Sequence, residues 1–164
     1  MKWLAARAYE EIQRILSDSS LVADLSLVNI VIGDETFPAV AGIDGADLLA
    51  QLNAVVISAN GNDALTLNDI VHRHQAFNLQ VVLYRQTAAG ENPVVETNDA
   101  VSRLLQEIVE NYQPITVDGG SLFSIEPAGD VRGYDRDESL WFDDAGLAIA
   151  VGRFDLALKA EADT

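Results

Sequence analysis

The feature that most constrains the fold is a change of hydrophobic period between residues 77 and 112. In "FNLQVVLYRQ" apolar and polar residues alternate, as in a half-buried strand, so that one face carries Phe77, Leu79, Val81 and Leu83. In "NDAVSRLLQEIVENY" the period becomes helical, and one apolar stripe contains Val101, Leu104, Leu105, Ile108, Val109 and Tyr112. A one-faced strand next to a one-faced helix indicates a sheet with helices packed on it.

The ends of this helix carry recognisable signals. We expect the segment "QTAAGENPVVE", residues 86–96, to be a loop, Thr97 or Asn98 to cap the helix, and Pro114 to end it. A strand, loop and helix in this order often bind phosphate, but the loop has a single glycine, Gly90, and the chain lacks both glycine-rich phosphate motifs. We therefore interpret the loop as a contact element.

The remaining elements follow from the same rules. Residues 3–17 predict an amphipathic helix, and "LVADL" a further helical turn. Strands are predicted at 27–33, within 53–63, at 70–85, in a hairpin about Gly119 and Gly120, and at 145–160 with Gly152 at a bend or bulge. Residues 34–52 read as a loop with one helical turn around 46–52, and "EADT" as a loose tail.

Together these elements predict a single α+β domain spanning residues 1–164. Its sheet is expected to be mixed and mainly antiparallel, since neighbouring strands joined by short connections usually pair antiparallel. Two amphipathic helices are expected on one face of this sheet.

Charge and composition exclude several classes of function. The chain has 10 Lys and Arg against 26 Asp and Glu, a formal net charge of −16, which would repel the phosphates of nucleic acid. It has no cysteine, so disulfides, thiol nucleophiles and thiolate metal sites are excluded. No stretch approaches the roughly 20 apolar residues of a membrane span, and no signal peptide is recognisable, so a soluble intracellular protein is expected.

Two clusters have the residue types of a partial metal site. His72 and His74 would point to one side of a strand, but no further histidine completes the ligand set, and exposed strand histidines are the commoner case. Asp135, Asp137 and Ser139 match the first ligand positions of a calcium loop. However, Leu140 and Gly146 occupy the positions that require glycine and glutamate, which excludes an EF-hand.

A solvated loop is therefore the preferred interpretation of Gly133–Asp144, and a looser cation site stays open. No catalytic residue, metal or cofactor is predicted. The enzyme alternative is a cation-dependent hydrolase that would use Asp135, Asp137, Asp143 or Asp144. In the same segment Trp141 and Phe142 are expected either to fold back on the core or to be buried by a partner.

The order of these elements resembles a known family. An N-terminal amphipathic helix, a β-rich section, a long strand like "FNLQVVLYRQ", a polar loop, a helix like "NDAVSRLLQEIVENY" and closing strands such as "LAIAVGRFDLAL" are together similar to the tail terminator, or tail completion, proteins of tailed bacteriophages. The similarity covers nearly the whole chain, apart from "DETFPAVAGIDGADLLAQL", and carries no residue-by-residue motif.

The resemblance implies a virion structural protein that assembles in the host cytoplasm. It would form a ring, usually of six subunits, that caps the tail tube, stops its polymerisation and meets the head-tail connector or neck proteins. DNA would only pass through the lumen, where acidic groups would repel it. The residues expected at the subunit, neck or tube interface are Arg85, Ala88, Gly90, Glu91, Trp141 and Phe142.

A second class of function fits the same charge and fold. A free-standing acidic α+β protein-binding domain, of the regulator or immunity type, would use its acidic face to engage a basic partner. Oligomeric state separates the two hypotheses, because such a domain would be a monomer or dimer.

Overall fold

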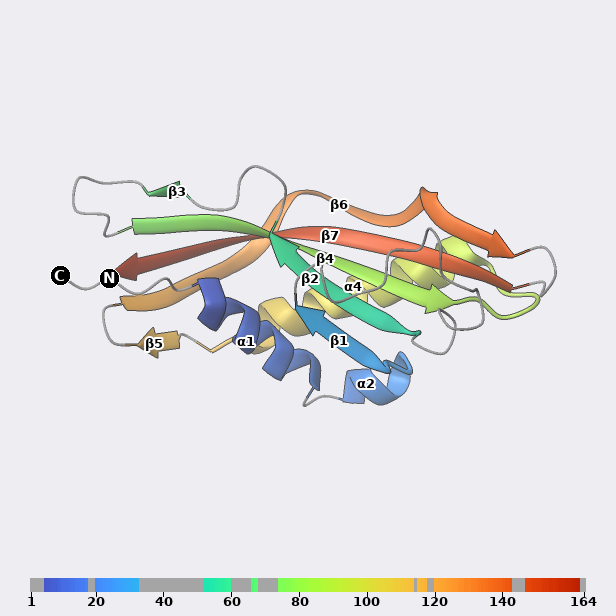
Figure 1. Cartoon of the computed structure of the whole chain (residues 1–164), viewed down its shortest axis with the longest axis horizontal. Helices are drawn as coiled ribbons and strands as arrows, with labels where there is room; N and C mark the ends of the chain where they lie inside the picture. Colours follow the sequence, from blue (N-terminus) through green and yellow to red (C-terminus); the bar gives the residue numbers. More distant parts are fainter. Residues whose placement is uncertain are drawn as a thin grey trace.

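The structure is a computed structural model that describes residues 5–17, 20–32, 52–59, 66–67, 74–113, 115–117, 120–142 and 147–162. These residues form a seven-stranded mixed sheet with helices packed against it, which confirms the predicted α+β class (Figure 1). The helices are α1 (Ala5–Ser17), α2 (Ser20–Asp24) and α4 (Pro93–Asn111). The strands are β1 (Asn29–Ile32), β2 (Ala54–Ala59), β3 (Thr66–Leu67), β4 (His74–Gln86), β5 (Ile115–Val117), β6 (Gly120–Phe142) and β7 (Leu147–Ala162).

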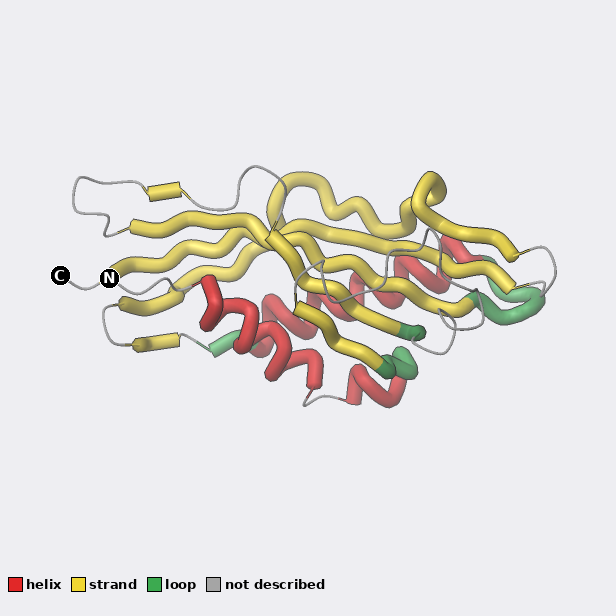
Figure 2. The backbone as a smooth tube through the Cα atoms, viewed as in Figure 1, coloured by secondary structure: helices red, strands yellow, loops and turns green. Residues whose placement is uncertain are grey.

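The strand order is β1-β2-β4-β7-β6-β5, with β3 paired to the first half of β4. The central strands β4 and β7 pair antiparallel from His74 opposite Glu161 to Gln86 opposite Ile149, and Figure 2 shows them with β6 as long yellow tubes. The expectation that neighbouring strands pair antiparallel is wrong for β1 and β2, which are parallel. A parallel pair needs a crossover of a dozen or more residues, and the connection between Ile32 and Ala54 is long enough.

The segment from Gly133 to Phe142, which was predicted to be a loop, is strand instead. It forms the last part of β6, which is far longer than its hydrophobic pattern suggested. Its pairing with β7 is interrupted by register shifts between Leu122 and Ser124, Ala128 and Gly133, and Asp135 and Leu140. The extra residues of β6 are accommodated at these irregularities. They interrupt the alternation of apolar and polar residues, so the strand is not recognisable from the sequence. Among the described strands, β5 covers the outer side of β6 only at Gly120–Leu122.

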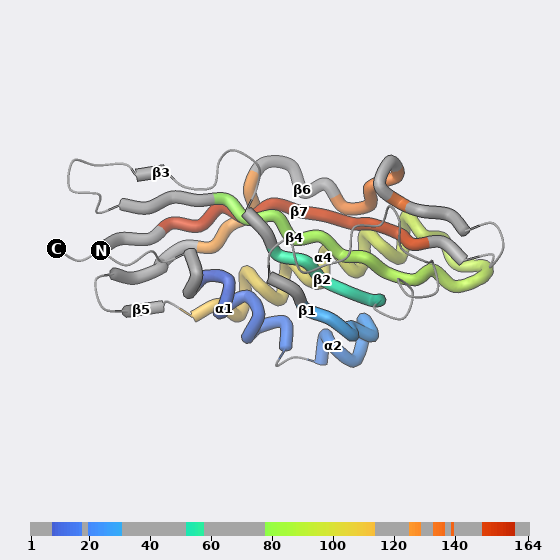
Figure 3. The backbone as a smooth tube through the Cα atoms, viewed as in Figure 1, coloured from blue at the N-terminus to red at the C-terminus, as the bar shows by residue number. Residues whose placement is uncertain are grey.

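One face of the sheet carries the core. Leu79, Val81 and Leu83 of β4 are buried beside Phe154, Leu156 and Leu158 of β7, as the alternation predicts for β4. Helices α1 and α4 lie side by side over this face (Figure 3). They contribute Ala8, Ile12, Ile15, Leu16, Ala100, Val101, Leu104 and Ile108 to the core.

Within α4 the buried row differs slightly from the predicted stripe. Val101, Leu104 and Ile108 are fully buried, whereas Leu105 and Tyr112 are only partly buried against the edge of the core. Spacings of three and four residues place the first three on the line that faces the sheet, and the other two flank that line. The side chain of Phe77 lies outside the described residues.

Gly152 was expected at a bend or bulge of the final strand, and the bulge is wrong. The residue pairs in unbroken register with Leu83 on β4, while the bulges lie on β6. A Cβ atom at Gly152 would meet the Cγ2 atoms of Val101 and Thr97, both on α4. Glycine is therefore needed here because the helix approaches the strand closely.

A buried carboxylate joins the two long helices. The Glu11 side chain of α1 accepts hydrogen bonds from Arg14 Nε and from the Gln113 backbone N–H, each at 2.9 Å, just past the end of α4. Donation by Arg14, together with the Gln113 N–H, holds the pKa of Glu11 below its usual value of 4.5, although burial acts in the opposite direction. The carboxylate thus fixes α1 against the C-terminal end of α4.

Candidate functional site

The candidate site lies at the end of the sheet where β4 finishes and α4 begins. The helix starts at Pro93, and its N-cap is Asn92, whose Oδ1 accepts from the backbone N–H groups of Val94 and Val95 at 3.2 and 3.3 Å. The predicted cap at Thr97 or Asn98 is therefore wrong, and the loop is shortened to residues 87–92. Asn followed by Pro is a start signal, because the first helical position needs no N–H.

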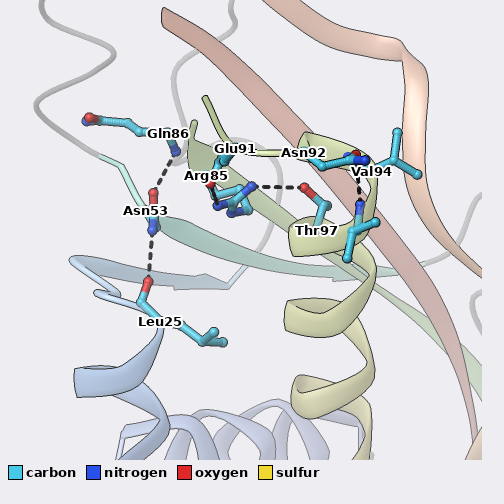
Figure 4. A network of polar contacts seen from close by, with 9 residues as sticks. Leu25, Asn53, Arg85, Gln86, Glu91, Asn92, Val94 and Thr97 are labelled. Atoms are coloured by element: carbon cyan, nitrogen blue, oxygen red, sulfur yellow. Dashed lines mark hydrogen bonds and ion pairs between the residues drawn. The ribbon is translucent and has the colours of Figure 1, made fainter. Parts of the chain in front are cut away.

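Two of the expected interface residues, one at the end of β4 and one in the loop, face each other (Figure 4). Arg85 Nη2 lies 2.9 Å from Glu91 Oε2, and Arg85 Nη1 donates to Thr97 Oγ1 at 3.2 Å. The side chains of Arg85 and Glu91 are only 13% and 16% exposed. The pair connects β4, the loop and α4, so it fixes the shape of this end, while Ala88 and Gly90 are exposed on the loop.

A single asparagine attaches the neighbouring elements to the same end. Asn53 Nδ2 donates to the carbonyl of Leu25 at 2.8 Å, and its Oδ1 accepts from the N–H of Gln86 at 2.7 Å (Figure 4). Its own carbonyl accepts from Val28 N at 2.8 Å. Asn53 thereby holds the turn after α2, the start of β1 and the end of β4 in one arrangement.

Two hollows open around this framework and share Ser26 and Asn53; together they are named the end groove here. The first, of about 340 Å³, is lined by Asp24, Leu25, Ser26, Asn53, Arg85, Glu96, Asp99, Ala100 and Arg103. The second, of about 490 Å³, is lined by Ser26, Val28, Leu52, Asn53, Gln86, Thr87 and Ala88.

One exposed apolar side chain lines the end groove, and two more lie in the first turn of α4. Val28, which lines the second hollow, is 61% exposed, and Val94 and Val95 in the first turn of α4 are 44% and 50% exposed. These are the exposed large hydrophobic residues of the described ranges. Val95 lies one helical turn before Asp99, which lines the first hollow. The sequence reading missed Val94 and Val95 because it placed them in a loop.

The first hollow has a surplus of negative charge. Arg103 pairs with Asp24 at 2.5 Å, and Arg85 pairs with Glu91, so both arginines already face a carboxylate. Glu96 and Asp99 also line the hollow and are exposed. The end groove is therefore acidic as well as partly apolar.

Trp141 and Phe142 finish β6 at the same end of the sheet, opposite Ala148 and Leu147 of β7. They lie near the level of Gln86, which pairs with Ile149, but β7 separates them from β4. Their side chains lie outside the described residues. The six expected interface residues are therefore brought to one end of the sheet, in two groups.

Side chains in the acidic part of β6 form contacts at the register shift between Asp135 and Leu140. Asp135 lies 3.0 Å from Arg153 of β7, and Ser139 Oγ donates to the Asp135 carbonyl at 2.6 Å and accepts from Val151 N at 3.1 Å. Two of the three proposed calcium ligands are thus engaged within the sheet. The side chains of Asp137 and His74, and the whole of His72, Asp143 and Asp144, lie outside the described residues.

Among the described side chains, no group of three or more His, Cys, Asp or Glu residues could hold a metal ion. In the same residues, no helix has the length and hydropathy needed to cross a membrane. A comparison with protein-family models finds no match, and a comparison with curated proteins finds none either.

Proposed function

We propose that the protein is a tail terminator of a tailed bacteriophage, a structural protein that caps the tail tube as a hexameric ring. In this role it stops polymerisation of the tube and joins the tail to the head and neck proteins. The order of its elements supports the proposal, since it agrees with the resemblance drawn from the sequence. The observation that carries it is the end groove, with the exposed Val28 in its lining, a surface suited to protein contact.

The construction of this surface suits assembly. Part-buried polar contacts of Arg85, Glu91 and Asn53 hold its walls in place. A partner would therefore meet a preformed surface, and little conformational freedom would be lost on binding. Exposed apolar side chains beside polar groups are the usual make-up of protein interfaces. A closed ring of identical subunits uses two different surfaces on each subunit, and the end with the groove offers one of them.

The charge of the chain adds a second requirement. A net charge of −16 per subunit becomes about −96 on a ring of six, and such charges repel unless salt screens them within about 10 Å at 0.1 M. Acidic groups facing a central channel would also keep passing DNA from adhering. Ring formation is therefore expected to depend on ionic strength.

Analytical ultracentrifugation across a salt series tests the proposal. The expected result is a monomer at low ionic strength and a discrete ring at high salt, at high concentration or on added ends of tail tubes of the same phage. Association that weakens steadily as salt rises would mean that opposite charges hold the subunits together, and would refute the repulsion argument. A monomer under all conditions, with no binding to tube ends, would overturn the proposal and favour the acidic protein-binding domain.

A further inference from the structure

We infer that the outer edge of β1 binds a short, uncharged, extended segment of another protein. The segment would add a strand to the sheet and place one apolar side chain in a hollow beside that edge. The inference goes beyond the proposed ring, because it concerns a different surface and a different kind of partner. The two can therefore fail separately.

The outer side of β1 is regular, and no described strand pairs with it. Figure 1 shows β1 at the margin of the sheet, and its parallel register with β2 has no shift. The Asn29 N–H donates to the Asn53 carbonyl at 3.3 Å, on the β2 side. Since successive peptide groups of a strand point to opposite sides, the N–H and C=O groups of Ile30 and Ile32 point away from β2. This side of β1 can bond a further strand.

A hollow beside this edge, named the edge hollow here, can receive a side chain. It has a volume of about 410 Å³ and lies where the end of α1, α2 and β1 meet. Val28 is 61% exposed there, and the side chains of Val22 and Ile30 are half-buried. An apolar side chain in the edge hollow would therefore remove apolar surface from water. The lining contains no charged residue and consists of Ser17, Val22, Leu27, Val28, Asn29 and Ile30.

The opposite side of the sheet shows how this fold protects an edge. The pairing of β6 is interrupted by register shifts, and Pro127 offers no N–H. Bulges, proline and charged residues are the usual means by which an edge avoids pairing with other chains. In β1 there is no proline, no charged residue and no register shift. The edge of β1 is thus the one of the two that suits strand addition.

Charge and length favour an extended segment over a second copy. Two copies paired through β1 would bring together chains that each have a net charge of −16. The four residues of β1 span about 13 Å, which is short for a contact that must bury about 800 Å² on each folded partner. An extended segment needs no such area, because main-chain hydrogen bonds and one side chain in a pocket supply its affinity. An uncharged segment also meets no net repulsion.

The test measures binding of a fluorescein-labelled hexapeptide of alternating Val and Thr by anisotropy. A second peptide carries Asp in place of Val. N-methyl groups, which remove N–H donors, are placed on all residues of a third peptide and on the odd or the even residues of two more. Methylation of alternate residues leaves one side of the extended chain able to bond, whereas methylation of all residues blocks both sides.

The protein variants address the edge hollow. Ser17→Trp places a large side chain over it from an exposed position at the end of α1. The matched control is Ser102→Trp, the same change at an exposed position on α4. Val22→Thr keeps the shape of a lining residue and adds a hydroxyl group. Circular dichroism and urea denaturation check that all variants fold.

The Val-Thr peptide is expected to bind the wild type, and the Asp peptide roughly tenfold or more weakly. Ser17→Trp should weaken the affinity by roughly tenfold to a hundredfold, as expected for the loss of one buried apolar side chain, and Val22→Thr by less. Ser102→Trp should change it less than about twofold. The fully methylated peptide should not bind, and at least one of the two half-methylated peptides should keep its affinity.

Three results would overturn the inference. They are absence of binding to the wild type, equal affinities of the two Trp variants, and a fully methylated peptide that binds as well as the unmodified one. Loss of binding by both half-methylated peptides would also count against it, since a strand added at one edge uses the donors of one side only.

Ultracentrifugation of the same variants separates this inference from the proposed function. Rings that persist in Ser17→Trp, together with lost peptide binding, support both. Rings with equal peptide binding in the two Trp variants would sink the inference alone. Peptide binding by a protein that stays a monomer under all conditions would sink the proposed function alone. Rings lost in Ser17→Trp but kept in Ser102→Trp would show that a second copy occupies the edge of β1, and the inference would be wrong.

Discussion

The contact between α4 and β7 at Gly152 supports a sharp prediction. In Gly152→Ala the added methyl group would lie within 3 Å of Thr97 Cγ2, at 2.8 Å, and closer still to Val101 Cγ2. Both neighbours belong to a helix that is packed against the core through Val101, Leu104 and Ile108. The helix can move away only by loosening that packing, so the substitution is expected to destabilise the fold.

The magnitude follows from two opposing effects. Overpacking a close-fitting core costs about 1–3 kcal/mol, whereas replacing glycine in the unfolded chain favours folding by about 0.4–1 kcal/mol. With the middle of each range the net loss is about 1.3 kcal/mol, which for a domain of this size corresponds to a decrease in Tm of roughly 3–5 °C. In the Val101→Ala background the nearest obstacle is removed, so the added methyl group should cost much less.

Urea denaturation of the wild type, both single variants and the double variant measures this coupling as a double-mutant cycle. A favourable interaction of about 0.5–3 kcal/mol between the two substitutions is expected, because residues in direct contact couple by that amount. Thr97→Ser, which keeps the hydroxyl group bonded to Arg85 and removes only the methyl group, should give partial relief. Strict additivity, or a Gly152→Ala protein as stable as the wild type, would refute the close approach.

Two further predictions concern the helices. Leu104→Ala, at a fully buried position, should lower the free energy of unfolding by roughly 2–5 kcal/mol, and Leu105→Ala, at a partly buried position, should lower it by less. Equal losses of the two variants in urea denaturation would contradict the assigned helix face. Because the pKa of Glu11 is lowered by folding, its contribution is present above about pH 4.5 and lost as pH falls through the folded pKa. The stability difference between the wild type and Glu11→Gln should therefore shrink on acidification, and an unchanged difference down to strong acid would exclude this role.

The parts of the fold that could be predicted are those with a clear hydrophobic period. The buried faces of β4 and α4 follow from alternation at Leu79, Val81 and Leu83 and from the helical stripe around Leu104. The beginning of α4 was misplaced because the apolar pattern starts later than the helix, whose first turn, with Val94 and Val95, is exposed. There the local signal of Asn92 and Pro93 was the better guide.

The candidate site was harder to predict because it depends on long-range contacts. The groove requires Asn53, which directly precedes β2, to bond Leu25 and Gln86, and nothing in the local pattern marks Asn53 as a connector. Likewise, Arg85 at the end of the predicted strand and Glu91 in the predicted loop were expected at an interface, but in the fold they pair with each other. The full length of β6 could not be inferred either, because its bulges interrupt the alternation of apolar and polar residues.

The irregular course of β6 has a consequence for how subunits can meet. Past Leu122, no described strand pairs with the outer side of β6, and an open edge of that length would normally recruit the edge of another chain. Here the two later register shifts interrupt the row of backbone donors and acceptors, and Pro127 offers no N–H at all. A subunit with such an edge resists stacking into open-ended fibrils through backbone pairing. In the proposed ring, contacts between copies would then be made by side chains. Such contacts can be strong at one geometry and absent at all others, which is what closure after a fixed number of subunits would require.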